Sequence, residues 1–84
     1  MTNDENYDSI RSLEFQLSRR GLESEAISLE VAIIRGGNRA ERLALAGVAL
    51  KSIRAGHPDI CRKALGGFIE ACVQEIRSEW PDYG

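Results

Sequence analysis

The chain has 84 residues, of which 43% are hydrophobic and 29% charged, and its formal net charge is −2. This composition is typical of a globular protein and excludes a disordered one. The small net charge does not indicate a nucleic acid or a membrane as the partner. No apolar run approaches the roughly 20 residues of a membrane span. Residues 1–10 are acidic and polar, unlike a secretory signal. We therefore expect one cytoplasmic domain over residues 1–84, with frayed ends at about 1–3 and 81–84.

Three arginines are followed by glycine within two residues, at Arg20-Gly21, Arg35-Gly36 and Arg54-Ala55-Gly56. Helices often end in this way, because a cation complements the helix dipole and a left-handed glycine closes the last turn. The three stops predict four helices, at about 4–20, 23–35, 39–55 and 58–80. Because the turns between them are short, we expect an all-α fold, a small antiparallel four-helix bundle.

The first predicted helix, residues 4–20, has acidic residues at its start and two arginines at its end. Its apolar residues recur at steps of three and four, as on one face of a helix. This stripe consists of Tyr7, Ile10, Leu13 and Leu17. Phe15 lies well away from the stripe.

The second predicted helix, residues 23–35, carries two apolar stripes rather than one. The stripe expected in the core consists of Leu22, Ala26, Leu29 and Ile33. The other consists of Ile27, Val31 and Ile34, with Glu23 and Glu30 between the two. A helix that is apolar over so wide an arc is buried by several neighbours or covered by a partner.

The third predicted helix, residues 39–55, begins with a capping box, because Glu41 follows Asn38 after three residues. Small residues at Ala40, Ala44 and Gly47 form a flat ridge on which another helix could pack. The basic residues of this helix are Arg39, Arg42, Lys51 and Arg54. They do not form a continuous stripe, so a helix-turn-helix that binds nucleic acid is the least favoured binding function.

The last predicted helix begins near Pro58, which suits a first helical position, and ends at Trp80 before Pro81. Its apolar face continues from Cys61 through Phe68 to Trp80. Gly66-Gly67 interrupts the opposite side, at a cost of about 2 kcal/mol relative to alanine. We expect either a bend or a close helix contact at this pair.

The sequence contains no pattern that indicates catalysis. His57 stands alone beside Pro58, which favours a solvated cap over a catalytic base. Cys61 and Cys72, if they share one continuous helix, lie about 16 Å apart, too far for a disulfide. These residues do not provide a metal site, and the glycine pairs lack a phosphate-binding motif. We expect no enzyme activity, no cofactor and no metal.

The acidic residues of the second helix have two interpretations. They can pair with the basic third helix within the chain, or they can border a docking surface for a basic protein. For the second interpretation we select Glu23, Ile27, Glu30, Val31 and Ile34 as partner-binding residues. The same stripe, or the ridge at Ala40, Ala44 and Gly47, could instead close a homodimer.

The stretch from Leu13 to Ile53, about half of the chain, reads L-x-x-x-L-x-x-x-G, then an apolar helix, then G-G-N-R-A-E and a leucine- and alanine-rich helix. It resembles small all-helical bacterial immunity-type proteins, which block the activity of a toxin encoded beside them. The resemblance implies a non-enzymatic role in which one surface occludes one protein partner, such as a basic toxin or enzyme.

Overall fold

The computed structural model describes residues 7–84, which form five α-helices and, within this range, no strand. In chain order the helices are α1 (Asp8–Arg19), α2 (Glu23–Arg35), α3 (Arg39–Gly56), α4 (Pro58–Lys63) and α5 (Gly66–Arg77). The prediction of an all-α fold is confirmed. The expected helix start at residue 4 and the frayed residues 1–3 lie outside the described residues. Tyr7, which the prediction places inside the first helix, is not helical, because its φ of 51° is left-handed, and α1 begins at Asp8.

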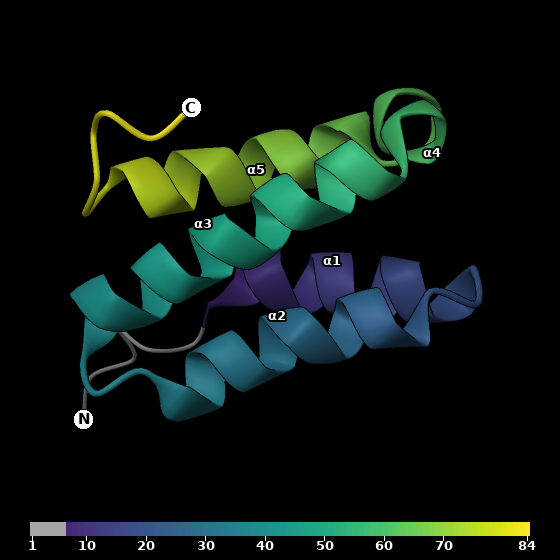
Figure 1. Cartoon of the computed structure of the whole chain (residues 1–84). Coiled ribbons are helices and arrows are strands. Elements are labelled where there is room, and N and C mark those ends of the chain that lie inside the picture. The colour runs from purple at the N-terminus through teal and green to yellow at the C-terminus, as the bar shows by residue number, and fades with distance from the viewer. Residues whose placement is uncertain (1–6) are drawn as a thin grey trace.

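The long helices reverse direction at each connection, and α4 turns the chain at the corner between α3 and α5 (Figure 1). The contacts follow this arrangement. Helix α2 packs against both α1 and α3, while α5 packs against the same two helices. The short α4 contacts α3 and α5. Helix α2 therefore has neighbours on the sides of α1 and α3, and its remaining face, which includes Ile27, Val31 and Ile34, is exposed.

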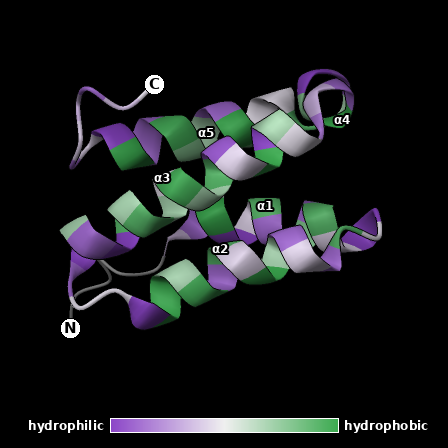
Figure 2. Cartoon of the chain, viewed as in Figure 1, coloured by the Kyte–Doolittle hydropathy of each residue, from purple (hydrophilic) through white to green (hydrophobic). Residues whose placement is uncertain are grey.

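The core contains the stripes that the sequence predicts for the first two helices, and Leu22 packs against it partly buried. Hydrophobic residues recur along every long helix between hydrophilic bands (Figure 2), and those of one face turn inward. The most deeply buried side chains are Tyr7, Ile10, Leu13, Leu17, Leu29, Leu43, Leu50, Leu65, Cys72 and Ile76. Phe68, which the sequence places on the core face, is 36% exposed instead, because the break before α5 turns the start of that helix outward.

The three arginine–glycine steps end their helices in different ways. Gly21 has φ +81°, and the Leu22 and Gly21 amides donate to the Leu17 and Ser18 carbonyls, as in a Schellman motif. Gly36 is extended, with φ −66° and ψ 141°. Its hydrogen is needed because a Cβ there would lie 2.7 Å from the Arg42 backbone. Gly56 is the last residue of α3. The left-handed glycine cap is therefore confirmed at Gly21 only.

The prediction of one continuous helix over 58–80 is wrong, because the helix is interrupted at Ala64 and Leu65. Leu65 is fully buried, and its amide donates to the Ile60 carbonyl at 3.1 Å. The glycine pair forms the first turn of α5, where two weak helix formers allow the chain to turn. No atom lies within 4 Å of a Cβ built on Gly67. The pair therefore marks a bend rather than a close helix contact.

Helix α5 ends at Arg77, three residues before the predicted end at Trp80. Pro81 restricts the backbone of Trp80 and so disfavours a helical conformation there. Trp80 is 44% exposed rather than buried, and its indole donates to the Ala40 carbonyl at 2.8 Å. Residues 81–84, for which we expected fraying, include Tyr83, whose hydroxyl donates to the Gly47 carbonyl at 2.8 Å.

Candidate partner-binding site

The second apolar stripe of α2 faces solvent. Ile27 is 51% exposed, Val31 38% and Ile34 69%, whereas Leu29 on the opposite side of the helix is buried. We call Ile27, Val31 and Ile34 the outer row of α2. Burial of these residues within the chain would have excluded a docking role, and the structure leaves them exposed. The free energy falls when a partner covers such side chains and removes their apolar surface from water.

A shallow groove of about 300 Å³ lies beside the outer row, between α1 and α2. Its walls combine carboxylates with apolar side chains and one guanidinium. Its principal residues are Arg11, Glu14, Phe15, Glu23, Ile27 and Glu30. We call it the acidic groove, because three carboxylates face one cation. Ile27 belongs to both features, so the outer row and the acidic groove form one surface.

Glu14 is the least solvated carboxylate of the acidic groove. Its side chain is 16% exposed, and its ion pair with Arg11 is long, at 3.9 Å. One carboxylate oxygen, Oε2, is buried without a hydrogen-bond partner. Burial raises the pKa of Glu14, Arg11 lowers it, and the charge of Glu30 raises it further. The groove therefore holds a carboxylate whose charge the chain stabilises poorly.

Glu23 and Glu30 are exposed, and neither forms an ion pair within residues 7–84. Glu23 accepts a hydrogen bond from the Ser18 hydroxyl at 2.7 Å, which ties the start of α2 to α1. The interpretation that these acids pair with the basic third helix is therefore not supported. Their charge stays available at the surface.

The basic residues of α3 turn toward other parts of the chain. Arg39 forms ion pairs with Glu75 at 3.5 Å and with Glu79 at 3.4 Å, both in the α5 region. Arg42 donates to the Gly36 carbonyl at 3.0 Å, and the Lys51 ammonium lies 5.5 Å from the Tyr83 ring centroid. These interactions engage three of the four basic side chains of α3 within the chain.

His57 is half-buried rather than a solvated cap. It lies between α3 and α4, and its Nε2 is 2.8 Å from a carboxylate oxygen of Glu25 on α2. The hydrogen bond with His57 lowers the pKa of Glu25. This pair joins the start of α2 to the corner of the fold, which is a structural role.

The ridge of small residues on α3 is covered by the end of the same chain. A Cβ on Gly47 would lie 2.8 Å from the Tyr83 ring, so glycine allows the ring to pack on the α3 backbone. The Trp80 indole bonds to Ala40 at the other end of the ridge. The ridge is therefore not an open surface for a second copy.

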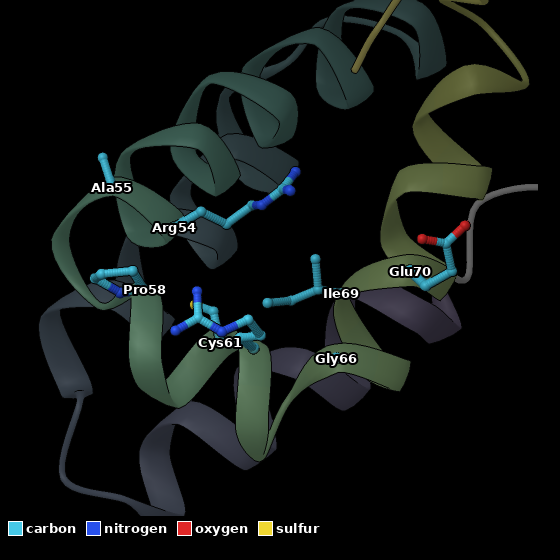
Figure 3. Close-up of a pocket in the computed structure, with 8 residues that line it drawn as sticks. Arg54, Ala55, Pro58, Cys61, Gly66, Ile69 and Glu70 are labelled. Carbon is cyan, nitrogen blue, oxygen red and sulfur yellow. The ribbon is translucent and has the colours of Figure 1, made fainter.

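A surface cavity of about 550 Å³ lies between α3, α4 and α5. Arg54 extends into the space between α3 and α5, near Ile69, and Cys61 lies below it (Figure 3). Burial raises the pKa of the Cys61 thiol, and that of Cys72 to about 12. Both thiols are free, and they behave as buried apolar groups rather than nucleophiles.

Among residues 7–84, no three His, Cys, Asp or Glu side chains are placed to hold a metal ion. No helix there is long and apolar enough to cross a membrane. Compared with known proteins, the chain matches no family model, no curated protein and no solved structure.

Sequence reasoning selected the α2 residues of this surface and missed those of α1. Phe15 stood out as a large apolar residue away from the core stripe, and it is 61% exposed at the acidic groove. Glu14 gave no signal, because a single acid in a helix is usually solvated. Only the packing of α1 against α2 brings Glu14 near Glu30.

Proposed function

We propose that this chain is a non-enzymatic interaction module that binds one basic protein partner through α2. The contact surface consists of the outer row and the acidic groove. An apolar centre supplies most of the binding free energy, and the carboxylates select a cationic partner. By analogy with immunity-type proteins, binding occludes the active region of the partner and inhibits it.

One observation carries the proposal, namely that exposed apolar and unpaired acidic side chains occur together on α2. At the junction of α3 and α5 the fold matches charges within the chain, as Arg39 does with Glu75 and Glu79. On α2 no cation of residues 7–84 pairs with Glu23 or Glu30, which lie beside three exposed aliphatic side chains. A contiguous apolar patch with a polar border is typical of an interaction site.

Self-association is the second candidate, and the charges on α2 argue against its antiparallel form. A two-fold interface places the same surface of each copy against the other. If the two α2 helices ran antiparallel, Glu23 and Glu30 of one copy would face Glu30 and Glu23 of the other. That arrangement costs free energy, so a basic partner of different sequence suits the surface better.

Within this proposal the helices act as a small antiparallel bundle, in which α4 and α5 together are a bent fourth helix. The bundle holds α2 from two sides, through α1 and α3. The backbone of the docking helix is then ordered before the partner binds. An ordered surface lowers the entropic cost of binding.

Site-specific photo-crosslinking tests the proposal. A photoreactive amino acid replaces Ile34 on the outer row in one variant and Lys63 at the exposed end of α4 in the control. The partner is crosslinked in cells of the source organism, identified, purified and mixed with the unlabelled chain. We expect crosslinking at position 34 only, a basic partner, and stoichiometric loss of the partner's activity in the purified mixture.

Ile27→Asp combined with Ile34→Asp then separates binding from folding. Both side chains are more than half exposed, so the double variant should keep the helical circular dichroism of the parent. We expect at least a hundredfold weaker binding to the purified partner, since two apolar contacts are replaced by buried charges. Equal crosslinking at positions 34 and 63 would contradict the docking site. A bound but fully active partner would contradict inhibition alone.

A further inference from the structure

The outer row and its acidic neighbours have the spacing of a coiled-coil seam. If Val31 is taken as an a position, Ile27 and Ile34 are both d positions. Glu23 and Glu30 then both occupy g positions, beside the seam. Seven residues of helix rise about 10.5 Å, so the two acids repeat after two turns, parallel to the apolar row.

The two flanks of this seam differ. On the side of α1 the g positions border the acidic groove, where Glu14 and Phe15 lie beside Glu30 and Ile27. On the side of α3 the e positions are Ser28, whose hydroxyl donates to the Glu25 carbonyl, and Arg35, the last residue of α2. The negative charge therefore lies on the flank beside α1, and the one cation of the opposite flank lies at the end of the helix.

Resting on the proposed function, we infer that the partner contacts this surface with one basic amphipathic α-helix that lies along α2. Apolar side chains of the partner helix, repeated every three and four residues, pack on Ile27, Val31 and Ile34. Lysine or arginine side chains along one edge of that helix lie over the acidic groove. There they pair with Glu23 and Glu30, and one enters beside Glu14.

The charges and the burial in the groove explain why a helix with a cationic edge fits. A cation beside Glu14 would supply the counter-charge that Arg11 provides only at 3.9 Å. In a helix the edge residues repeat every seven positions, which matches the separation of Glu23 and Glu30. An acidic or uncharged helix could cover the apolar row but would leave Glu23 and Glu30 desolvated and unpaired.

Synthetic peptides test this inference without the natural partner. The first is a 21-residue heptad peptide, about three heptads long, with leucine at a and d and lysine at e and g. The second replaces each lysine by glutamate, and the third keeps the lysines but replaces each leucine by glutamine. Binding to the full chain is measured by fluorescence anisotropy, and the contact surface is mapped by amide chemical shifts.

We expect the lysine–leucine peptide to bind at least about tenfold tighter than either control, because both apolar contact and charge pairing are needed. Its amide shifts should concentrate at Glu14, Phe15, Glu23, Ile27 and Glu30. Glu23→Gln with Glu30→Gln should weaken binding about fivefold, since glutamine keeps the Ser18 hydrogen bond and removes the charge. The matched control, Glu70→Gln with Asp82→Asn, changes exposed acids elsewhere and should leave binding unchanged.

Three results would overturn the inference. The first is equal binding of the glutamate peptide, and the second is a shift map centred away from α2, for example on the cavity between α4 and α5. The third is a concentration-dependent dimer of the chain itself, abolished by Ile34→Asp, which would assign the surface to a second copy.

The failure of this inference can be distinguished from failure of the proposed function. If the natural partner crosslinks at position 34 but its crosslinked segment is a loop or a strand, the docking function stands and the helical mode is wrong. If the peptide binds as expected but no protein crosslinks at position 34, the surface has the inferred chemistry and the proposed function is wrong.

Discussion

Two regions of this molecule contain the same kinds of charged side chain, but they differ in how well these charges are paired within the chain. At the junction of α1, α3 and α5, the Glu75 carboxylate accepts a hydrogen bond from Ser9 and pairs with Arg39, which also pairs with Glu79. In the acidic groove, Glu14 has one distant cation, and Glu23 and Glu30 have none among the described residues 7–84. Matched charges serve the fold, whereas the unmatched ones are available to a partner.

The junction should therefore lose more stability than the groove when a cation is removed. Arg39→Ala deletes two ion pairs and the contact with the Tyr7 ring at 5.6 Å. We expect the free energy of unfolding to fall by about 2 kcal/mol, because Glu75 is left half-buried and unpaired. Arg11→Ala in the groove should cost less than about 0.5 kcal/mol. Urea denaturation of both variants measures the difference, and equal losses would contradict the comparison.

At the α3 ridge, Tyr83 makes a second contact in which the polar groups are paired within the chain. Tyr83→Phe keeps the ring on Gly47 and removes the hydroxyl that donates to the Gly47 carbonyl. We expect a loss of about 1 kcal/mol, measured by thermal unfolding. The variant should bind the lysine–leucine peptide like the parent chain, because the ridge and α2 serve different purposes. A change in peptide affinity would argue against that separation.

Two carboxylates should respond to pH with opposite signs. The pKa of Glu25 lies below its ordinary value of 4.5, because of its hydrogen bond with His57. Its contribution to stability is present above that value and is lost as the pH falls through the folded-state pKa. The pKa of Glu14 lies above 4.5, because of burial. Its favourable contribution is present below the unfolded-state pKa and is lost as the pH rises through the folded-state value.

At neutral pH, Glu25→Gln should therefore destabilise the chain, and Glu14→Gln should stabilise it by about 0.5 kcal/mol. Both differences from the parent should shrink as the pH falls to about 4 and below. Denaturation midpoints measured between neutral and acidic pH test both signs. A stability loss for Glu14→Gln at neutral pH would show that the groove stabilises the charged form of Glu14.

The smallest expected effect on stability belongs to the outer row. Ile34 is 69% exposed, so Ile34→Ser should change the free energy of unfolding by less than about 0.5 kcal/mol. Ile33→Ser, one residue away and only 7% exposed, should cost about 3 kcal/mol. Chemical denaturation of this adjacent pair separates the outer row from the core. Similar losses would mean that Ile34 is covered in solution.

Local sequence rules predicted the first three helices well, because their signals lie within a few residues of each end. Asn38 caps α3 by accepting from the Glu41 amide at 2.8 Å, as the capping box predicts. The carboxylate of Glu41 reaches Gly37 instead of Asn38. The break before Gly66 was harder to predict, since a bend and a tight contact leave the same glycine pair in the sequence. The break between Lys63 and Gly66, together with the empty space around a Cβ on Gly67, shows the bend.

The sequence by itself determined which α2 residues could serve a partner, because helical periodicity separates Ile27, Val31 and Ile34 from the core stripe. Only the tertiary structure decided that this row stays open while the α3 ridge is covered. Periodicity describes one helix, whereas exposure depends on which neighbours the chain supplies. Here the C-terminal residues return to Gly47, α1 adds Glu14 and Phe15 to the groove, and no described segment covers the outer row.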